Sequence, residues 1–333
     1  MPRTPLQIDD PGTRAALAAD LDSPPSPRTN RLALFLADAL GPSAVAIIHY
    51  GSHAQRSDAR PESAHDFFVV VDRYKPSYQS LATTVGTSYR PATAALLSHV
   101  LAPNVVAITD NDVTPPLMAK CAILSLRDFR RACSARARDH FTQGRLFQHT
   151  QLVWTRDAVA RAVVVDSLVE ARARTFCWGR AYLPPRFDAD AYCRVLLETS
   201  FGAEVRPESR ERVAALLLAQ RETMIRMYAE LLRYLADKRI LARAGKVYTD
   251  PSPPGRSDRF RVALYFRRSK LRATLRWFKY IALYDDWLTY VIQKLERRSG
   301  VSVTLTARER RWPLIFLWPK AIHFLRSRAQ RRG

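Results

Sequence analysis

Residues 43–72, SAVAIIHYGSHAQRSDARPESAHDFFVVVD, are the most informative part of the chain about its architecture. Two short apolar runs, 43–50 and 67–71, are rich in β-branched residues, a composition typical of buried strands. Gly51-Ser52 follows the first run, and glycine and serine favour turns. Asp66 precedes the second run. The stretch therefore predicts two buried strands of one sheet, separated by a turn and a polar segment.

The flanking sequence continues the alternation of helix and strand. Helical periodicity over 31–40 ends at Gly41-Pro42, and one or two helices are expected over 78–101. Two more apolar runs, 104–109 and 118–124, predict further strands. Because strands interleaved with helices are typical of α/β domains, we predict an α/β (α+β) sheet domain.

The character of the chain changes after residue 125. Segments 126–141, 157–177 and 208–240 have helical periodicity, which predicts a mostly helical domain. The prolines of 251–254 indicate a linker or a long loop. We therefore divide the chain into a loose N-terminal lead-in (1–28), a sheet domain (29–125), a helical domain (126–255) and a basic amphipathic C-terminal region (256–333).

The charge of the chain is strongly positive and unevenly distributed. Its 53 basic and 31 acidic residues give a formal net charge of +22. Residues 256–333 contain 20 basic and 5 acidic residues, so most of the excess lies in the last quarter of the chain. A balance this basic indicates a polyanionic partner, either a nucleic acid or an anionic membrane surface. The four cysteines have no zinc or CxxC spacing and are expected to be buried thiols in a reducing compartment.

Gly51-Ser52 and Asp66 together suit the binding of a nucleotide triphosphate. A Gly-Ser turn after a strand lets backbone N–H groups and a hydroxyl approach phosphates closely. An acidic residue on the neighbouring strand can hold Mg²⁺, which bridges phosphate oxygens. A second carboxylate two residues after Asp66 would face the same side, but Phe68 stands there. The next acid, Asp72, lies roughly 20 Å further along an extended strand.

This pattern resembles the active site of the polymerase-β-like nucleotidyltransferase superfamily, whose members usually have Asp-x-Asp on the second strand. In this chain a single Asp precedes an apolar strand that ends in Val-Asp. This arrangement resembles more closely that of the mitochondrial translocator assembly and maintenance family, whose members are mitochondrial-type phosphatidate cytidylyltransferases. The segment that carries this resemblance contains His49-Tyr50-Gly51-Ser52, then Gln55, then the strand from Asp66 to Asp72.

A second block supports the same resemblance, which covers about residues 43–155. Residues 120–125 (KCAILS), Asp128-Phe129 and Gly144-Arg145-Leu146 are similar to the family's Lys-Tyr-Gly-Val-Ile-Ser strand, acidic helix and Ala-Gly-Arg-Leu turn. The chain departs from the family in three places. Residues 74–78 replace a Trp-His, His53 replaces a glycine, and Cys121-Ala122 replaces Tyr-Gly.

The resemblance implies a phosphatidate cytidylyltransferase, which converts CTP and phosphatidate into CDP-diacylglycerol and pyrophosphate with Mg²⁺ or Mn²⁺. Asp66 would hold the metal and act with Lys120 in catalysis. An unpaired ammonium within an apolar strand is unfavourable, so a phosphate would compensate Lys120. Asp110 and Asp112 end a predicted strand and are either an additional metal carboxylate or solvated turn acids. The expected nucleotide-binding residues are Tyr50, Gly51, Ser52, Gln55, Lys120 and Arg145.

The C-terminal segment 312–325, WPLIFLWPKAIHFL, combines apolar residues with flanking arginines. It is too short to span a bilayer but suits shallow insertion at a membrane interface, where tryptophans prefer the headgroup level. The alternative is a core segment packed on the helical domain. We expect a peripheral protein on the cytoplasmic side of a membrane. The expected membrane contacts are Trp312, Leu314, Phe316, Trp318, Ile322 and Phe324.

Two other functions remain open from the sequence. The first is nucleotidyl transfer to nucleic acid or another phosphorylated acceptor, although the basic excess lies some 200 residues after the predicted site, which disfavours a nucleic-acid partner. The second is a membrane-bound protein without activity, which Phe68 at the usual second Asp position favours. The sequence does not distinguish the NTP, the acceptor or the oligomeric state.

Overall fold

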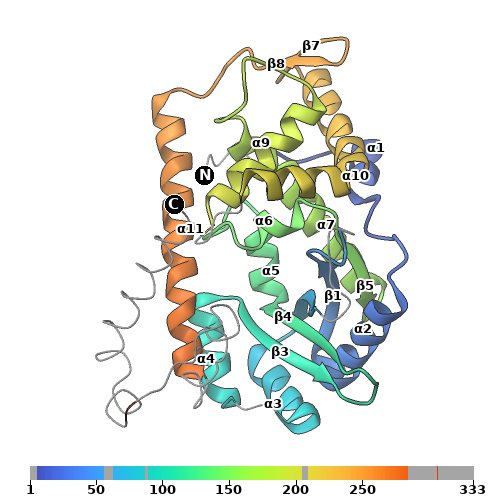
Figure 1. Cartoon of the computed structure of the whole chain (residues 1–333). Coiled ribbons are helices and arrows are strands. Elements are labelled where there is room, and N and C mark those ends of the chain that lie inside the picture. The colour runs from blue at the N-terminus through green and yellow to red at the C-terminus, as the bar shows by residue number, and fades with distance from the viewer. Residues whose placement is uncertain (1–5, 56–62, 87–88, 205–208, 284–305, 307–333) are drawn as a thin grey trace. The chain divides into compact units, whose positions relative to one another are not determined.

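A computed structural model describes residues 6–55, 63–86, 89–204, 209–283 and 306 (Figure 1). The chain divides into two compact units, residues 1–277 and 278–333. The described part of the second unit consists of residues 278–283, which end helix α11 (Arg256–Leu283), and Thr306. The expected membrane segment 312–325 and residues 284–305 of the basic C-terminal region lie outside the described residues.

A five-stranded mixed sheet forms the centre of the N-terminal half. Its strand order is β3-β4-β2-β1-β5, with β2 and β4 parallel and the other neighbours antiparallel. The first four strands match the predicted apolar runs within two residues at each end. The strands are β1 (Ala44–Tyr50), β2 (His65–Val71), β3 (Asn104–Asp110), β4 (Leu117–Ser125) and β5 (Gln151–Thr155).

Helices cover both faces of this sheet. Helix α2 lies on one face, where Thr29 Oγ1 is 3.2 Å from His65 Nδ1. The other face packs on α5 and α7, since Phe68 and Val70 share a core cluster with Phe129 and Val164. Side chains alternate along a strand, so Asp66 lies on the same face as Phe68. The helices of this half are α1 (Pro11–Ala18), α2 (Pro27–Leu40), the 3₁₀ turn η1 (Gly41–Ser43), α3 (Tyr74–Val85), α4 (Pro91–Leu101) and α5 (Leu126–Cys133).

The second half of the first unit is mostly helical, as predicted. Its core is a large cluster that includes Trp178, Tyr192, Tyr228 and Leu231, all fully buried. A small sheet with the order β6-β8-β7 borders it. The elements are α6 (Gln143–Leu146), α7 (Ala158–Ala173), α8 (Thr175–Gly179), β6 (Arg186–Phe187), α9 (Ala189–Gly202), α10 (Arg210–Asp237), β7 (Ala242–Ala244), β8 (Val247–Thr249) and α11 (Arg256–Leu283).

These elements confirm the mixed α/β class, but they differ from the sequence expectation in several places. The helix expected over 126–141 ends at Cys133, and α9 was not predicted. The lead-in is not loose in its described part, because α1 packs on α7 and α10 and buries Leu17, while Leu21 is buried beyond it. Strand β5 was not predicted. It is only five residues long and gains its place by pairing with β1. The proposed domain boundaries at 125 and 255 stay predictions.

None of the helices in the described part of the chain is both long enough and apolar enough to cross a membrane.

Candidate active site at the Gly51-Ser52 turn

The turn after β1 lies directly against the carboxylate of Asp66. Tyr50, the last residue of β1, is the antiparallel partner of Asp66 on β2. Gly51 has φ +82°, and a Cβ atom built on it would be 2.8 Å from Asp66 Oδ2. A side chain at position 51 would therefore combine backbone strain with a steric conflict. Glycine is required here because the backbone both turns and approaches the carboxylate.

Asp66 lies in an electrostatic environment that is only partly compensated. Burial raises the pKa of its carboxyl above the ordinary value, while Lys120, Arg145 and His53 each lower it by a smaller amount. Lys120 is the parallel neighbour of Asp66 on β4. An additional positive charge would stabilise the ionised form of this carboxylate, because the cations already present do not fully offset the cost of burying its charge.

The structure corrects the expected environment of Lys120. Its strand neighbours Ala119 and Cys121 are fully buried, but the Lys120 side chain itself is exposed. The alternation of a strand explains this, since successive side chains point to opposite faces. The ammonium of Lys120 thus needs no bound phosphate to offset burial. Lys120 belongs to the candidate site because it neighbours Asp66 in the sheet.

Arg145 reaches the same region from α6. Its guanidinium lies over the Phe141 ring at 4.0 Å and forms an ion pair with Glu204 at 3.1 Å. Its Nη1 donates to the Phe141 carbonyl oxygen at 2.9 Å. Burial lowers the pKa of Arg145, but neighbouring negative charges, led by Glu204 and including Asp66, outweigh it and hold that pKa above its ordinary value. Glu204 lies 138 positions after Asp66 and no local motif marks it, so the sequence gives no signal for this ion pair.

Ser52 and Tyr50 flank Gly51 in different surroundings. The Ser52 side chain is half-buried, and its hydroxyl has no hydrogen-bond partner within the described ranges. The Tyr50 ring is buried and packs on Phe68 with 4.6 Å between ring centroids. Ser52 therefore has the exposure and the available donor expected of a phosphate ligand, whereas Tyr50 supports the turn from the core.

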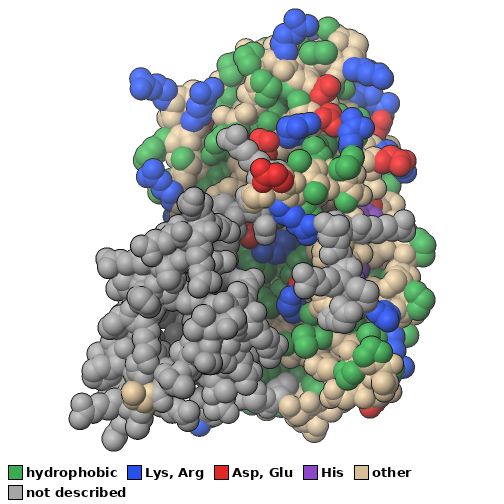
Figure 2. Space-filling model, in the orientation of Figure 1, with side chains coloured by type: hydrophobic (Ala, Val, Ile, Leu, Met, Phe, Trp, Pro, Cys, Tyr) green, Lys and Arg blue, Asp and Glu red, His purple; other side chains and the backbone are tan. Residues whose placement is uncertain are grey.

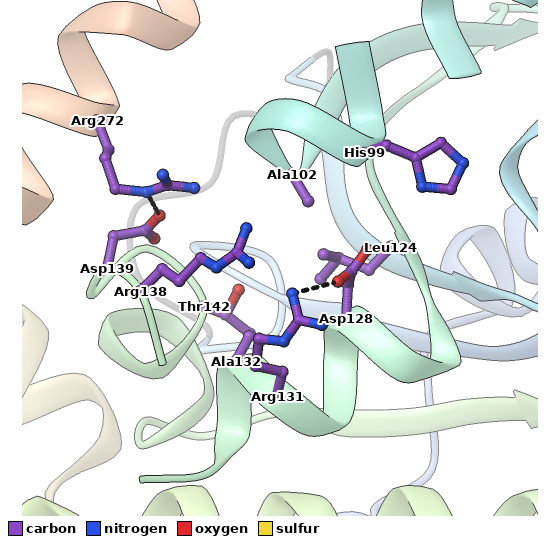
Figure 3. Close-up of a pocket in the computed structure, with 10 residues that line it drawn as sticks. All are labelled: His99, Ala102, Leu124, Asp128, Arg131, Ala132, Arg138, Asp139, Thr142 and Arg272. Carbon is purple, nitrogen blue, oxygen red and sulfur yellow. Dashed lines mark hydrogen bonds and ion pairs between the residues drawn. The ribbon is translucent and has the colours of Figure 1, made fainter. Parts of the chain in front are cut away.

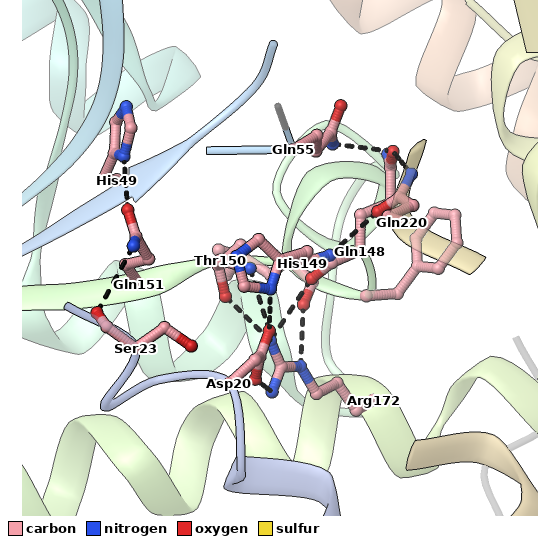
Figure 4. A network of polar contacts seen from close by, with 12 residues as sticks. Asp20, Ser23, His49, Gln55, Gln148, His149, Thr150, Gln151, Arg172 and Gln220 are labelled. Carbon is pink, nitrogen blue, oxygen red and sulfur yellow. Dashed lines mark hydrogen bonds and ion pairs between the residues drawn. The ribbon is translucent and has the colours of Figure 1, made fainter. Parts of the chain in front are cut away.

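Gln55 closes the turn and points into the protein interior. Its backbone N–H donates to the Gly51 carbonyl oxygen at 2.9 Å. Its buried side chain donates to Gln148 Oε1 at 2.9 Å, and Gln220 on α10 donates to the same oxygen at 3.1 Å (Figure 4). The structure thus places Gln55 as a support of the turn, with its amide engaged by the helical half.

A buried ion pair continues this polar network (Figure 4). Arg172 donates to both carboxylate oxygens of Asp20, at 2.6 and 2.9 Å, and both side chains are at most 1% exposed. Arg172 also donates to Thr150 Oγ1 and to the Gln148 carbonyl oxygen. Burial raises the pKa of Asp20, but Arg172 and further hydrogen bonds outweigh it and hold that pKa below its ordinary value. Breaking such a pair costs about 3–5 kcal/mol, so the network fixes residues 148–150 beneath the turn.

Histidines line the side of the turn that faces α2. The rings of His53 and His65 stack at 4.0 Å, and His49 lies 5.4 Å from His65. Burial is the main cause that lowers the pKa of His49 to about 4 and that of His65 to about 3. These two side chains are therefore neutral at pH 7 and stabilise the turn by packing.

Asp110 and Asp112, which the sequence leaves open as an additional metal carboxylate or as solvated turn acids, do not lie beside Asp66. Asp110 is buried on the α2 face, where its carboxylate accepts from Arg31 Nε at 2.8 Å and from the Asp112 backbone N–H at 3.1 Å. Asp110 lies two strands across the sheet from Asp66 and three residues further along, which places the two residues roughly 14 Å apart. Asp112 is exposed beyond the end of β3.

The other candidates for a second carboxylate lie elsewhere too. Asp72, at the opposite end of β2, is paired with Arg156 at 2.5 Å. Phe68 is fully buried in the core cluster, so the usual Asp-x-Asp position is a packing position in this chain. No group of three or more His, Cys, Asp or Glu side chains arranged to hold a metal ion occurs among the residues with a described placement.

No protein-family model matches the chain, and no curated protein matches it either. The family resemblance therefore depends on the quoted motifs and on their arrangement around Asp66.

Proposed function

We propose that the chain is a nucleotidyltransferase of the phosphatidate cytidylyltransferase type, acting at a membrane surface. The observation that supports this most is the contact between the Gly51 turn and the Asp66 carboxylate. The turn after β1 and the first part of the paired strand β2, 15 positions apart, meet here as phosphate binding and metal binding would require. The choice of CTP and phosphatidate comes from the motif resemblance.

The donor set fits a divalent cation that is shared with a nucleotide. Mg²⁺ is usually held by one or two carboxylates together with substrate phosphates and waters. Asp66 supplies one carboxylate, and its raised pKa reflects a charge that a cation would stabilise. When bound, the ion would neutralise phosphate oxygens and polarise the α-phosphorus.

The residues around Asp66 have complementary tasks in this proposal. The backbone of Gly51 and the Ser52 hydroxyl receive phosphate oxygens, because no side chain at position 51 blocks their approach. Lys120 and Arg145 supply positive charge near Asp66. A phosphate monoester acceptor is already anionic at neutral pH, so the transfer needs little general-base assistance.

A labelled-nucleotide assay tests the proposal directly. The full chain is incubated with each α-labelled NTP and Mg²⁺, with and without phosphatidate vesicles, and CDP-diacylglycerol and pyrophosphate are measured. Asp66→Asn removes the charge and keeps the shape, so turnover should fall by a factor of 100 or more. Asp72→Asn is the matched control, since it removes the same charge from the other end of β2.

Two further variants probe phosphate binding. Ser52→Ala and Lys120→Ala should each weaken CTP or lipid-phosphate binding by about 1–3 kcal/mol, the value of one charge-assisted hydrogen bond. Calorimetric titration with CTP measures this. If both variants keep wild-type affinity and turnover, the two side chains have only structural roles.

One observation favours a second candidate, a membrane-bound protein without activity. Asp66 has no second carboxylate from Asp110, Asp112 or position 68. The assay distinguishes the active enzyme from the inactive protein. If the chain binds CTP but forms no product with any of the NTPs, the inactive protein is supported.

The surface shown in Figure 2 bears on the nucleic-acid alternative. Over α9 and α10, basic and acidic side chains are interspersed on this face of the molecule. Ion pairs such as Arg221–Asp190 and Arg226–Glu222 account for part of this mixture. A mixed surface attracts a polyanion less strongly than a continuous basic groove.

A further inference from the structure

A polar pocket lies apart from the Gly51 turn, between α4, α5, the loop 134–142 and α11 (Figure 3). The guanidinium groups of Arg131, Arg138 and Arg272 point toward its centre, together with the Thr142 hydroxyl. Asp128 and Asp139 are the acidic residues in its lining. Two regions that are far apart in sequence, residues 131–138 and α11, thus bring arginines to one concave surface.

The arginines of this pocket outnumber its aspartates. Asp139 accepts from Arg272 at 2.8 Å and from Arg276, next along α11, at 2.5 Å. A single carboxylate therefore serves two guanidinium groups. Asp128 pairs with Arg131 at 3.1 Å, and Arg138 has no ion-pair partner in the described part of the chain. In the lining itself, three arginines then face two aspartates, a local excess of one positive charge, and Arg276 adds a further guanidinium beside the pocket.

The ion pair between Asp139 and Arg276, beside the pocket, is buried. The Asp139 side chain is 9% exposed and that of Arg276 is 8% exposed. Arg276 Nη1 is buried and has no hydrogen-bond partner among the residues that the structure describes. Burial is the main cause that lowers the pKa of Arg276, the Asp139 carboxylate raises it, and the charges of Arg272 and Arg145 lower it. Because Asp139 is shared between Arg272 and Arg276, it balances the positive charge at the pocket only in part, and an anion bound there would supply further negative charge.

The charge and the donors match a phosphate monoester. Such a group has a charge of about −1.5 to −2 at pH 7 and accepts several hydrogen bonds. Guanidinium groups bind phosphate oxygens in pairs, and three of them converge here with a hydroxyl. A phosphodiester has one free oxygen fewer and a smaller charge, so it would accept fewer hydrogen bonds from these donors and bind more weakly.

The pocket is separate from the Asp66 site. Leu124, which lines it, is the partner of Val70, four residues along β2 from Asp66 and roughly 13 Å away. Phe141 lies between them, because its ring contacts Phe68 and both Arg145 and Arg276 lie over it. A phosphate in this pocket would therefore be a second anion, not the reacting one.

We propose that the arginine pocket formed by Arg131, Arg138 and Arg272 binds a phosphate monoester, which joins the loop 134–142 to α11. The source is a free phosphate compound or a lipid headgroup. Binding at this site does not depend on the nucleotidyltransferase proposal, because none of its residues belongs to the Gly51 turn.

The test measures anion binding by the full chain in the absence of CTP. Inorganic phosphate and glycerol 3-phosphate are titrated by calorimetry in a phosphate-free buffer, with dimethyl phosphate as the diester control. We expect inorganic phosphate and glycerol 3-phosphate to bind, and dimethyl phosphate to bind at least about tenfold more weakly. Arg138→Gln should weaken monoester binding by about tenfold. Because Arg138 is exposed and unpaired among described residues, this variant should fold normally, which circular dichroism verifies.

Matched variants and a vesicle arm complete the experiment. Arg268→Gln removes the same charge from an exposed position on α11 and should leave binding unchanged. Vesicles of phosphatidylcholine with phosphatidate, a monoester, are compared with vesicles containing phosphatidylglycerol, a diester. If Arg138→Gln weakens binding in the calorimetric titrations, the ligand of the pocket is a free phosphate compound. If the variant weakens binding only to phosphatidate vesicles, the ligand is a lipid headgroup. The proposal is overturned if Arg138→Gln leaves the binding of inorganic phosphate, glycerol 3-phosphate and phosphatidate vesicles unchanged. That outcome is independent of whether Asp66→Asn abolishes turnover.

Discussion

Gly51 provides a sharp test of the contact on which the candidate site depends. Gly51→Ala should destabilise the fold because a Cβ atom would be 2.8 Å from Asp66 Oδ2 and because φ is +82°. The backbone strain alone costs about 1–2 kcal/mol. Moving the Asp66 side chain out of its preferred rotamer adds about 0.5–1.5 kcal/mol. The expected loss in the free energy of unfolding is therefore about 2–3 kcal/mol.

Gly86 separates the two contributions to this loss. It also has a positive φ, +64°, but a Cβ atom there would meet nothing within 4 Å. Gly86→Ala should thus report the strain alone, about 1–2 kcal/mol. Asp66→Ala removes the carboxylate oxygens while keeping the Cβ atom, so Gly51→Ala in that background should cost little more than Gly86→Ala.

Urea denaturation of the four variants, followed by circular dichroism, measures these differences. The double-mutant cycle of Gly51→Ala and Asp66→Ala should show a coupling of about 0.5–1.5 kcal/mol, the cost of displacing the carboxylate. Zero coupling would show that the turn does not touch Asp66, and the proposed phosphate and metal site would lose its main support.

Two other predictions concern pH and membrane binding. Burial lowers the pKa of His49 to about 4 from 6.5, so its unfolded form takes up a proton first as the pH falls. Stability due to His49 is present above pH 6.5 and is lost as the pH falls toward 4. His49→Gln should flatten urea-unfolding stability over this range by about 1.4 kcal/mol per pH unit, and pH-dependent unfolding of the wild type is the reference. Deletion of 307–333 should release the protein from anionic vesicles while leaving CTP binding largely intact, and wild-type binding should weaken as salt rises; cosedimentation of the truncated chain at wild-type levels would contradict the interfacial assignment.

The sequence predicted those elements whose stability is local or strongly patterned. Strands β1, β2, β3 and β4 were found because each is a compact apolar run, and β-branched residues in such runs favour buried strands. Strand β5 was missed, since a five-residue segment has no distinctive period and depends on pairing with β1. Helix α1 was missed because eight residues near several prolines look irregular until Leu17 packs against α7 and α10.

The candidate site shows the same division. Gly51-Ser52 and Asp66 could be identified from residue type and order, because a turn glycine and an acid before an apolar strand are local signals. The exposure of Lys120 could not, since it depends on which strand face is covered. Glu204 and the supporting Gln148 and Gln220 gave no signal, because each meets its partner only through packing of the helical half.

By itself, the sequence determined the mixed α/β class, the Gly-Ser turn and the position of Asp66. These follow from the periodicity and backbone preferences of neighbouring residues. Only the tertiary structure decided that Gly51 lies against Asp66, that Asp110 lies on the other face with Arg31, and that arginines of α5 and α11 share a pocket. Such placements depend on strand register and on which helix covers which face. Contacts between residues distant in the chain set both, and no local pattern encodes them.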